Sequence, residues 1–153
     1  MKNRLLMSLV VLVSFGWFIT GLDHLNKSKP CVNVYIDFGS LDNNSKMSKC
    51  VPTEKDTGLN ILQKSGINLE GTNKYGLKVI CRVNNLPTTK QESCATMPPA
   101  DAYWAFITKE KSGIVNPMPK WGWAQKGISE VYFNPGDSLG LIFTEKGKVR
   151  WPD

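Results

Sequence analysis

The sequence predicts an α+β domain that consists of a small, mainly antiparallel sheet and one short helix. Two observations support this prediction. Apolar and polar residues alternate in several segments beyond position 31, which is typical of half-buried strands. Only one segment carries both start and stop signals for a helix. A chain of 153 residues with 41% hydrophobic and 21% charged residues fits one domain, and is neither a disordered tail nor a multi-span membrane protein.

The first predicted strand covers residues 32–38, where Val34, Ile36 and Phe38 point to one face and the intervening residues to the other. A turn rich in Asn, Asp and Ser follows at residues 39–46, and residues 47–51 form the return strand of a hairpin. Residues 31–50 are therefore expected to form one hairpin.

The predicted helix begins after Asp56 or Thr57, either of which can act as its N-cap. Leu59 and Leu62 form its buried side, and Gly66 ends it. With two to three turns, the helix depends on tertiary packing for its stability.

The rest of the chain is predicted to consist of strands and turns. A loop at residues 84–101 and a tight turn at 134–137 separate the strands. One short helix between hairpins suits a β-grasp-like arrangement. The predicted strands are residues 76–83, 102–108, a short segment around Trp121 and Trp123, residues 138–144, and a last strand at 148–151.

Residues 1–30 differ in composition from the predicted domain at 31–153. Lys2 and Arg4 precede an apolar run at residues 5–22, the pattern of a signal peptide or an N-terminal membrane anchor. Its 18 residues are at the lower limit for crossing the hydrocarbon layer, so both alternatives stay open. The positive end stays in the cytoplasm. We therefore expect an extracytoplasmic domain, either secreted or held at the membrane by residues 5–22.

Four cysteines lie beyond this leader, an even number that predicts two disulfides in an exported domain. Of three pairings, we favour Cys81 with Cys94, which closes a proline-containing loop, and Cys31 with Cys50, which closes the first hairpin. The cysteine spacings suit no zinc site, so neither a metal nor a cofactor is expected. Lipid attachment at Cys31 is excluded because lysines and a proline precede it.

Charge and histidine content exclude further classes of function. Residues 31–153 carry 15 basic and 12 acidic residues without a basic run containing aromatic residues, so no nucleic-acid partner is expected. The single histidine, His24, precedes the domain, which excludes catalysis and metal binding by histidine within it.

Several short motifs together resemble a known family. The sequence is similar to the C-terminal β-domain of transcobalamin and intrinsic factor, in the stand-alone form of bacterial exported proteins. The similarity covers residues 32–144, and its motifs are Thr57-Gly58-Leu59 with Gly66, Val79 to Asn84, Leu86-Pro87, Cys94, Ala102 to Phe106, Trp121, Trp123, Gly127 and Pro135-Gly136-Asp137.

The resemblance implies a corrinoid-like ligand but only part of a site for it. In the vitamin carriers this domain lies on one side of cobalamin, and a larger helical domain lies on the other. The present chain is too short to contain that helical domain. A partner or a second copy would have to complete the site. No ligand-contacting residue is carried over from the family.

The candidate ligand-binding residues are the aromatic side chains Tyr103, Trp104, Trp121 and Trp123. Flat rings on an exposed sheet face stack on ring-shaped ligands. The alternative is that these rings fill the core. Trp121 and Trp123 share a face because they are two residues apart on a strand, whereas Tyr103 and Trp104 face opposite sides.

Asp37, Asp101 and Asp137 are the candidates for a catalytic carboxylate pair, as in glycoside hydrolysis. Asp101 and Asp137 stand in turn sequences, where Asp commonly binds the local backbone instead. We therefore predict a non-enzymatic exported binding module, whose ligand is a corrinoid or another small molecule. A module that binds a cell-envelope protein is the alternative, and a small hydrolase comes third.

Overall fold

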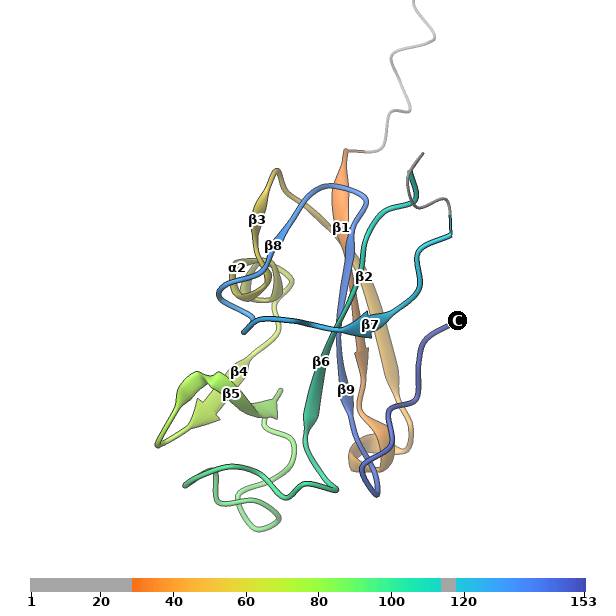
Figure 1. Cartoon of the computed structure of the whole chain (residues 1–153). Coiled ribbons are helices and arrows are strands. Elements are labelled where there is room, and N and C mark those ends of the chain that lie inside the picture. Colours follow the sequence, from red (N-terminus) through yellow and green to blue (C-terminus); the bar gives the residue numbers. More distant parts are fainter. Residues whose placement is uncertain (1–28, 114–117) are drawn as a thin grey trace, which may run out of the picture.

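The computed structural model describes residues 29–113 and 118–153 (Figure 1). The predicted signal peptide or anchor, with its apolar run at residues 5–22 and His24, lies outside the described residues. No helix within the described ranges is long and apolar enough to span a membrane.

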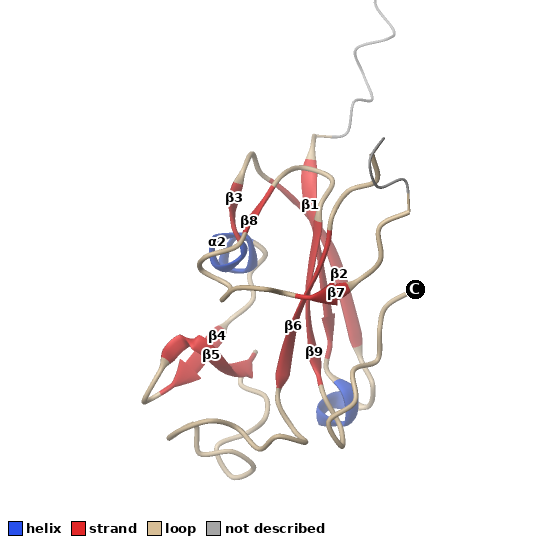
Figure 2. Ribbon diagram, in the orientation of Figure 1, coloured by secondary structure: helices blue, strands red, loops and turns tan. Residues whose placement is uncertain are grey.

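A five-stranded sheet is the centre of the fold (Figure 2). Its strand order is β2-β1-β9-β6-β7, and every neighbouring pair is antiparallel except β1 and β9, which are parallel. The α+β prediction with mainly sheet is confirmed, while the parallel pair was not predicted. The strands are β1 (Cys31–Asp37), β2 (Lys46–Pro52), β6 (Trp104–Lys109), β7 (Gly122–Trp123) and β9 (Ser138–Phe143).

Smaller elements surround this sheet. Two pairs of strands, β3 with β8 and β4 with β5, form separate two-stranded sheets. β3, β4 and β8 were not predicted because two to four residues are too few to show an alternation. The elements are η1 (a 3-10 helix, Gly39–Asp42), β3 (Asp56–Thr57), α2 (Gly58–Lys64), β4 (Leu69–Thr72), β5 (Gly76–Val83) and β8 (Tyr132–Phe133).

The helix α2 begins where the sequence predicted. Thr57 is its N-cap, and the Thr57 side chain accepts a hydrogen bond from the backbone N–H of Asn60 at 3.3 Å. A Cβ atom at Gly58 would lie 3.0 Å from the carbonyl oxygen of Ile128 and 3.1 Å from the ring of Phe133. Glycine at position 58 therefore lets the helix start pack directly against the segment before β8.

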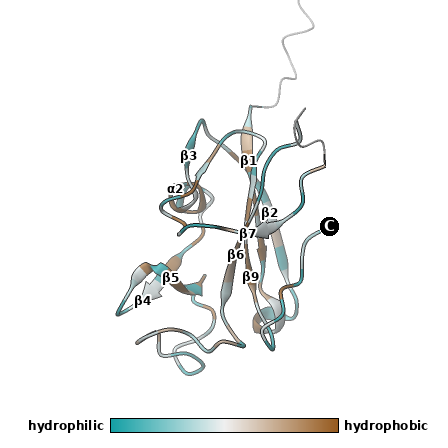
Figure 3. Ribbon diagram, in the orientation of Figure 1, coloured by the Kyte–Doolittle hydropathy of each residue, from teal (hydrophilic) through white to brown (hydrophobic). Residues whose placement is uncertain are grey.

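The hydrophobic core lies between α2 and one face of the sheet, here called the helix face. The alternating residues of β1 are fully buried there, as predicted, and so are Ile61 and Leu62 of α2. Figure 3 shows the same apolar character in β9. The core members from the sheet are Val32, Val34, Ile36, Val51, Trp104, Leu139, Leu141 and Phe143.

The opposite side of the sheet, here called the second face, is also partly covered. Ile107 and Ile142 are fully buried there. Trp123 is the cross-strand partner of Ile107, and its ring packs edge-on against Trp151 with centroids 5.8 Å apart. The predicted last strand at residues 148–151 is wrong, because only an isolated bridge joins Glu145 and Lys148. Side-chain contacts, and not the hydrogen bonds of a strand ladder, hold this segment against the sheet.

A buried ion pair fixes the C-terminal segment to the end of β1. The Asp37 side chain is fully buried, and its Oδ1 accepts hydrogen bonds from the Gly39 N–H and from Arg150 Nη2, each at 2.9 Å. The other oxygen of Asp37 has no hydrogen-bond partner among the residues that the structure describes. Arg150 also donates to Asn44 at 2.6 Å. Arg150 thus neutralises a charge that would be costly to bury alone.

Both predicted disulfides are confirmed. Cys31 pairs with Cys50 across the β1–β2 hairpin, and Cys81 of β5 pairs with Cys94 in the following loop. In the chain-entropy model each closed loop stabilises the fold by about 3 kcal/mol. Two disulfides in a domain of this size indicate an oxidising, extracytoplasmic environment.

The Asp37–Arg150 pair predicts a loss of stability when Arg150 is replaced. Arg150→Met leaves a buried carboxylate without its cation, so the free energy of unfolding should fall by about 2–3 kcal/mol. Urea denaturation at pH 7, with both disulfides intact, measures the change. The exposed Lys148 gives the control Lys148→Met, with an expected change below about 0.5 kcal/mol. Equal losses in the two variants would contradict the prediction.

Asp56 predicts part of the pH dependence of stability. Hydrogen bonds from Lys64, then from Asn60 and the Thr57 N–H, lower the pKa of Asp56 from 3.8 to about 2. Ionised Asp56 therefore stabilises the fold above its unfolded pKa, and this contribution disappears as the pH falls through about 2. The stability difference between the wild type and Asp56→Asn should be constant near neutral pH and shrink between pH 4 and 2, measured as urea midpoints.

Lys64→Met is the control for the Asp56 prediction, because Lys64 is the largest cause of the low pKa of Asp56. This variant should reproduce most of the change in acid dependence. A pH profile that Asp56→Asn leaves unaltered would show that Asp56 has the same pKa in the folded and unfolded states.

Candidate binding groove

A groove lies between β5 and β6 and has a volume of about 740 Å³. We call it the β5–β6 groove. Its walls come from four parts of the chain: β5, the loop at residues 97–100, the first half of β6, and the segment at residues 123–128. Its lining is mainly apolar or aromatic and includes Leu77, Val79, Met97, Pro98, Pro99, Tyr103, Trp104, Phe106, Trp123 and Ile128.

Three of the four predicted ligand-binding residues line this groove. Tyr103 is half-buried, and the Trp123 side chain is 46% exposed. Trp104 is only 6% exposed, and its ring packs between Phe38 and Phe143 with centroid distances of 5.6 and 5.5 Å. Trp104 therefore belongs to the core and offers the groove only a small part of its surface.

The indole of Trp104 is further fixed by a hydrogen bond from its Nε1 to the carbonyl oxygen of Leu86, at 3.1 Å. This bond joins β6 to the chain after β5. Trp104 thus fills the core, which was the alternative to ligand binding in the sequence prediction. Tyr103 and Trp123 remain accessible to a ligand.

Trp121 lies elsewhere, in a hollow of about 470 Å³ on the second face. We call it the Tyr35 hollow, because the rings of Trp121 and Tyr35 lie 6.2 Å apart in it. Lys109 Nζ lies 5.9 Å from the centroid of the Trp121 ring. Burial, followed by the charge of Asp37, raises the pKa of Tyr35. The four predicted residues therefore form no single site.

The groove has a basic rim. Lys78 and Lys126 are among its lining residues, and none of the described residues that line it is acidic. Met97, which is 60% exposed, and the following prolines were missed as site residues from sequence. The pair Pro98-Pro99 beside an exposed apolar side chain was the available signal, because consecutive prolines hold a loop in an extended shape.

A buried arginine positions the β5 wall of the groove. Arg82 of β5 is 4% exposed and forms an ion pair with Glu70 of β4. Its Nε donates to the carbonyl oxygen of Pro87 at 2.9 Å, and Nη2 donates to the carbonyl of Glu92. Together with the Cys81–Cys94 disulfide, Arg82 therefore fixes the loop after β5 to the strand.

The candidate carboxylates do not come together as a pair. Asp37 aligns with Ile142 of β9, whereas Asp137 immediately precedes Ser138, which aligns with Asn33. Asp137 therefore lies five residues along the strand from the position level with Asp37, about 16 Å, which is beyond the spacing that glycosidases use. Asp101 is exposed at the turn where its carbonyl accepts the Gly147 N–H.

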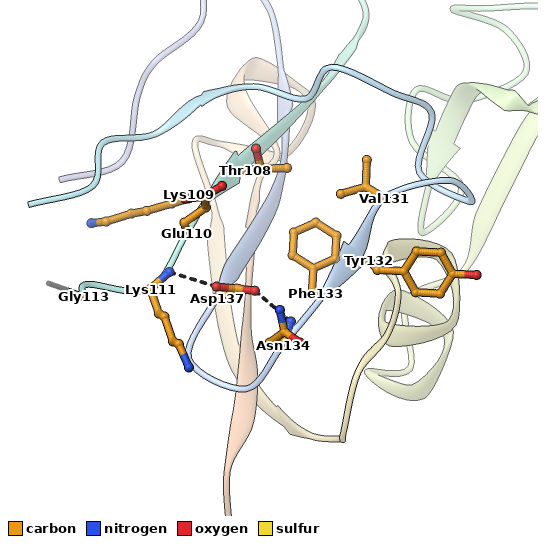
Figure 4. Close-up of a pocket in the computed structure, with 10 residues that line it drawn as sticks. All are labelled: Thr108, Lys109, Glu110, Lys111, Gly113, Val131, Tyr132, Phe133, Asn134 and Asp137. Carbon is orange, nitrogen blue, oxygen red and sulfur yellow. Dashed lines mark hydrogen bonds between the residues drawn. The ribbon is translucent and has the colours of Figure 1, made fainter. Parts of the chain in front are cut away.

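Asp137 has a structural role. Its Oδ1 accepts the Lys111 N–H at 2.8 Å, and its Oδ2 accepts the Asn134 N–H at 2.7 Å (Figure 4). The carboxylate thereby closes the turn before β9 and fixes the end of β6. Within the part of the chain that the structure describes, no group of three or more His, Cys, Asp and Glu could hold a metal ion.

No protein-family model matches the chain, and no curated protein or solved structure is detectably similar to it.

The burial of the tryptophans predicts different effects of their replacement. Trp104→Ala should lower the free energy of unfolding by about 3–5 kcal/mol, because it removes a core ring. Trp123→Ala should cost less than about 1.5 kcal/mol, because nearly half of its surface is in water. Urea denaturation followed by far-UV circular dichroism measures both. Unfolding by Trp123→Ala would place Trp123 in the core and remove it from the accessible wall.

Proposed function

We propose that the chain is a non-enzymatic exported binding module whose ligand lies in the β5–β6 groove. The module is secreted or held at the membrane by its N-terminal segment. The main support is the groove itself: about 740 Å³, lined by Tyr103, Trp123 and apolar side chains. Ligand sites are commonly concave and apolar, with a few polar groups at fixed positions.

We further propose that the fold is a β-grasp-like arrangement. The supporting observation is the strand order, in which parallel β1 and β9 lie side by side between β2 and β6, and α2 crosses one face. This arrangement is compatible with the proposed resemblance to the transcobalamin C-terminal domain.

The resemblance suggests a corrinoid-like compound as the small ligand. A corrin ring is flat and largely apolar, so the exposed rings of Tyr103 and Trp123 suit stacking on it. Lys78 and Lys126 supply donors at the rim of the groove. This chain would contribute one side of the complete site, and a partner or a second copy would supply the other.

Equilibrium dialysis of the oxidised full chain against cobalamin and a stripped corrin precursor tests this ligand class. Saturable binding at micromolar concentration or below is the expected result, with an affinity at least tenfold lower in Trp123→Ala. Tyr132 is 61% exposed and lies outside the groove, so Tyr132→Ala is the matched control. Absence of binding up to millimolar concentration would eliminate the free-standing corrinoid site.

A cell-surface protein-protein interaction module without a small-molecule ligand is the second candidate function. The observation that favours it is the outer edge of β6. The strand β7 pairs with β6 only at Ile107 and Thr108, so among the described strands Trp104 to Phe106 have a neighbour on the β9 side alone. Such an edge is a template for pairing with another chain.

A further inference from the structure

The hydrogen-bond pattern of β6 shows which backbone groups face the β5–β6 groove. The Tyr103 carbonyl accepts the Thr144 N–H at 2.8 Å, on the β9 side. The Phe106 carbonyl accepts the Ala124 N–H at 3.1 Å, on the opposite side. Because backbone groups alternate sides along a strand, the N–H and C=O of Trp104 and the N–H of Phe106 point away from β9.

These three backbone groups lie at the groove and have no hydrogen-bond partner in the described part of the chain. Trp104, Ala105 and Phe106 all line the groove. Within residues 29–113 and 118–153, no backbone hydrogen bond to Trp104 or to the Phe106 N–H exists on that side. A little-exposed backbone group that lacks a partner costs free energy, so this edge favours a ligand that supplies alternating C=O and N–H groups.

We propose that the β5–β6 groove takes an extended peptide segment with acidic side chains, which adds to the edge of β6 as a strand. The inference rests on the proposed function, because the groove is the same, and it specifies the partner of the second candidate. The peptide strand lies beside Trp104–Phe106, in the space that the two-residue strand β7 leaves open.

The side chains of the groove define the chemistry of the peptide. An added strand places successive side chains on opposite faces. Leu77, Val79 and Pro99 offer apolar surface to one set of them. Lys78 and Lys126, without an acidic neighbour in the lining, select carboxylates in the other set. An alternation of apolar and acidic residues fits both requirements.

The test uses the full oxidised chain and three labelled probes. The first is the acetylated, amidated pentapeptide Glu-Val-Glu-Val-Glu, and the second replaces each Glu with Lys. The third carries N-methyl groups on all five residues, which removes the backbone donors of both edges while it keeps every side chain. Fluorescence anisotropy measures affinity, and amide hydrogen exchange measures protection at Trp104 and Phe106, with Thr108 as the already paired reference.

The acidic peptide should bind and slow exchange at Trp104 and Phe106 about tenfold or more, while the basic and N-methylated peptides bind at least tenfold more weakly. The double variant Lys78→Glu and Lys126→Glu should bind the basic peptide more tightly than the acidic peptide, which reverses the preference of the wild type. The exposed Lys55 lies outside the groove, so Lys55→Glu is the matched control and should leave it unchanged.

Four results would overturn the inference. Equal binding of the N-methylated peptide would mean that side chains alone bind it, without strand addition. Protection that rises with protein concentration in the absence of peptide would assign the edge to a second copy of the chain. No peptide binding, with cobalamin perturbing the groove amides, would refute the peptide but keep the groove as the site. If neither the peptides nor cobalamin changes amide exchange at Trp104 and Phe106, the proposed function fails as well.

Discussion

The parallel pairing of β1 with β9 is the constraint on which the rest of the structure depends. Ile36 and Leu141 are buried on the helix face of this pair, and Ile142 is buried on the second face. Parallel strands are stable where both faces are covered. The sheet therefore needs two covers, and the chain between β1 and β9 and the chain after β9 supply them.

The two covers differ in kind. The helix α2 covers the helix face with a conventional apolar core, in which Ile61 and Leu62 are fully buried. The C-terminal segment covers the second face through a few side chains, chiefly Arg150 on Asp37 and Trp151 on Trp123. At the centre of this face, position 140 has no room for a side chain. A Cβ atom at Gly140 would lie 3.0 Å from the Tyr35 carbonyl oxygen and 3.1 Å from the Ile107 side chain.

The shortness of β7 leaves the groove open. This strand has two residues and pairs with β6 only at Ile107 and Thr108. The chain then leaves β6 after Ala124. Trp104–Phe106 of β6, the strand β5 and the loop at residues 97–100 therefore enclose a space that no described element fills. Two features give the walls a definite shape: the Cys81–Cys94 disulfide and the buried Arg82. The groove therefore lies beside a strand edge that β7 covers only at Ile107 and Thr108.

The sequence by itself determined the local elements and the covalent links. The alternation in β1 and β5, the cap at Thr57 and both disulfide pairings depend on neighbours in the chain, so local physical rules suffice to predict them. Only the tertiary structure decided that β1 lies parallel to β9, that Trp104 is in the core, and that Trp121 and Trp123 line separate hollows. These facts depend on strand order and on where β7 ends, which are set by contacts between residues far apart in the sequence and leave no local periodicity.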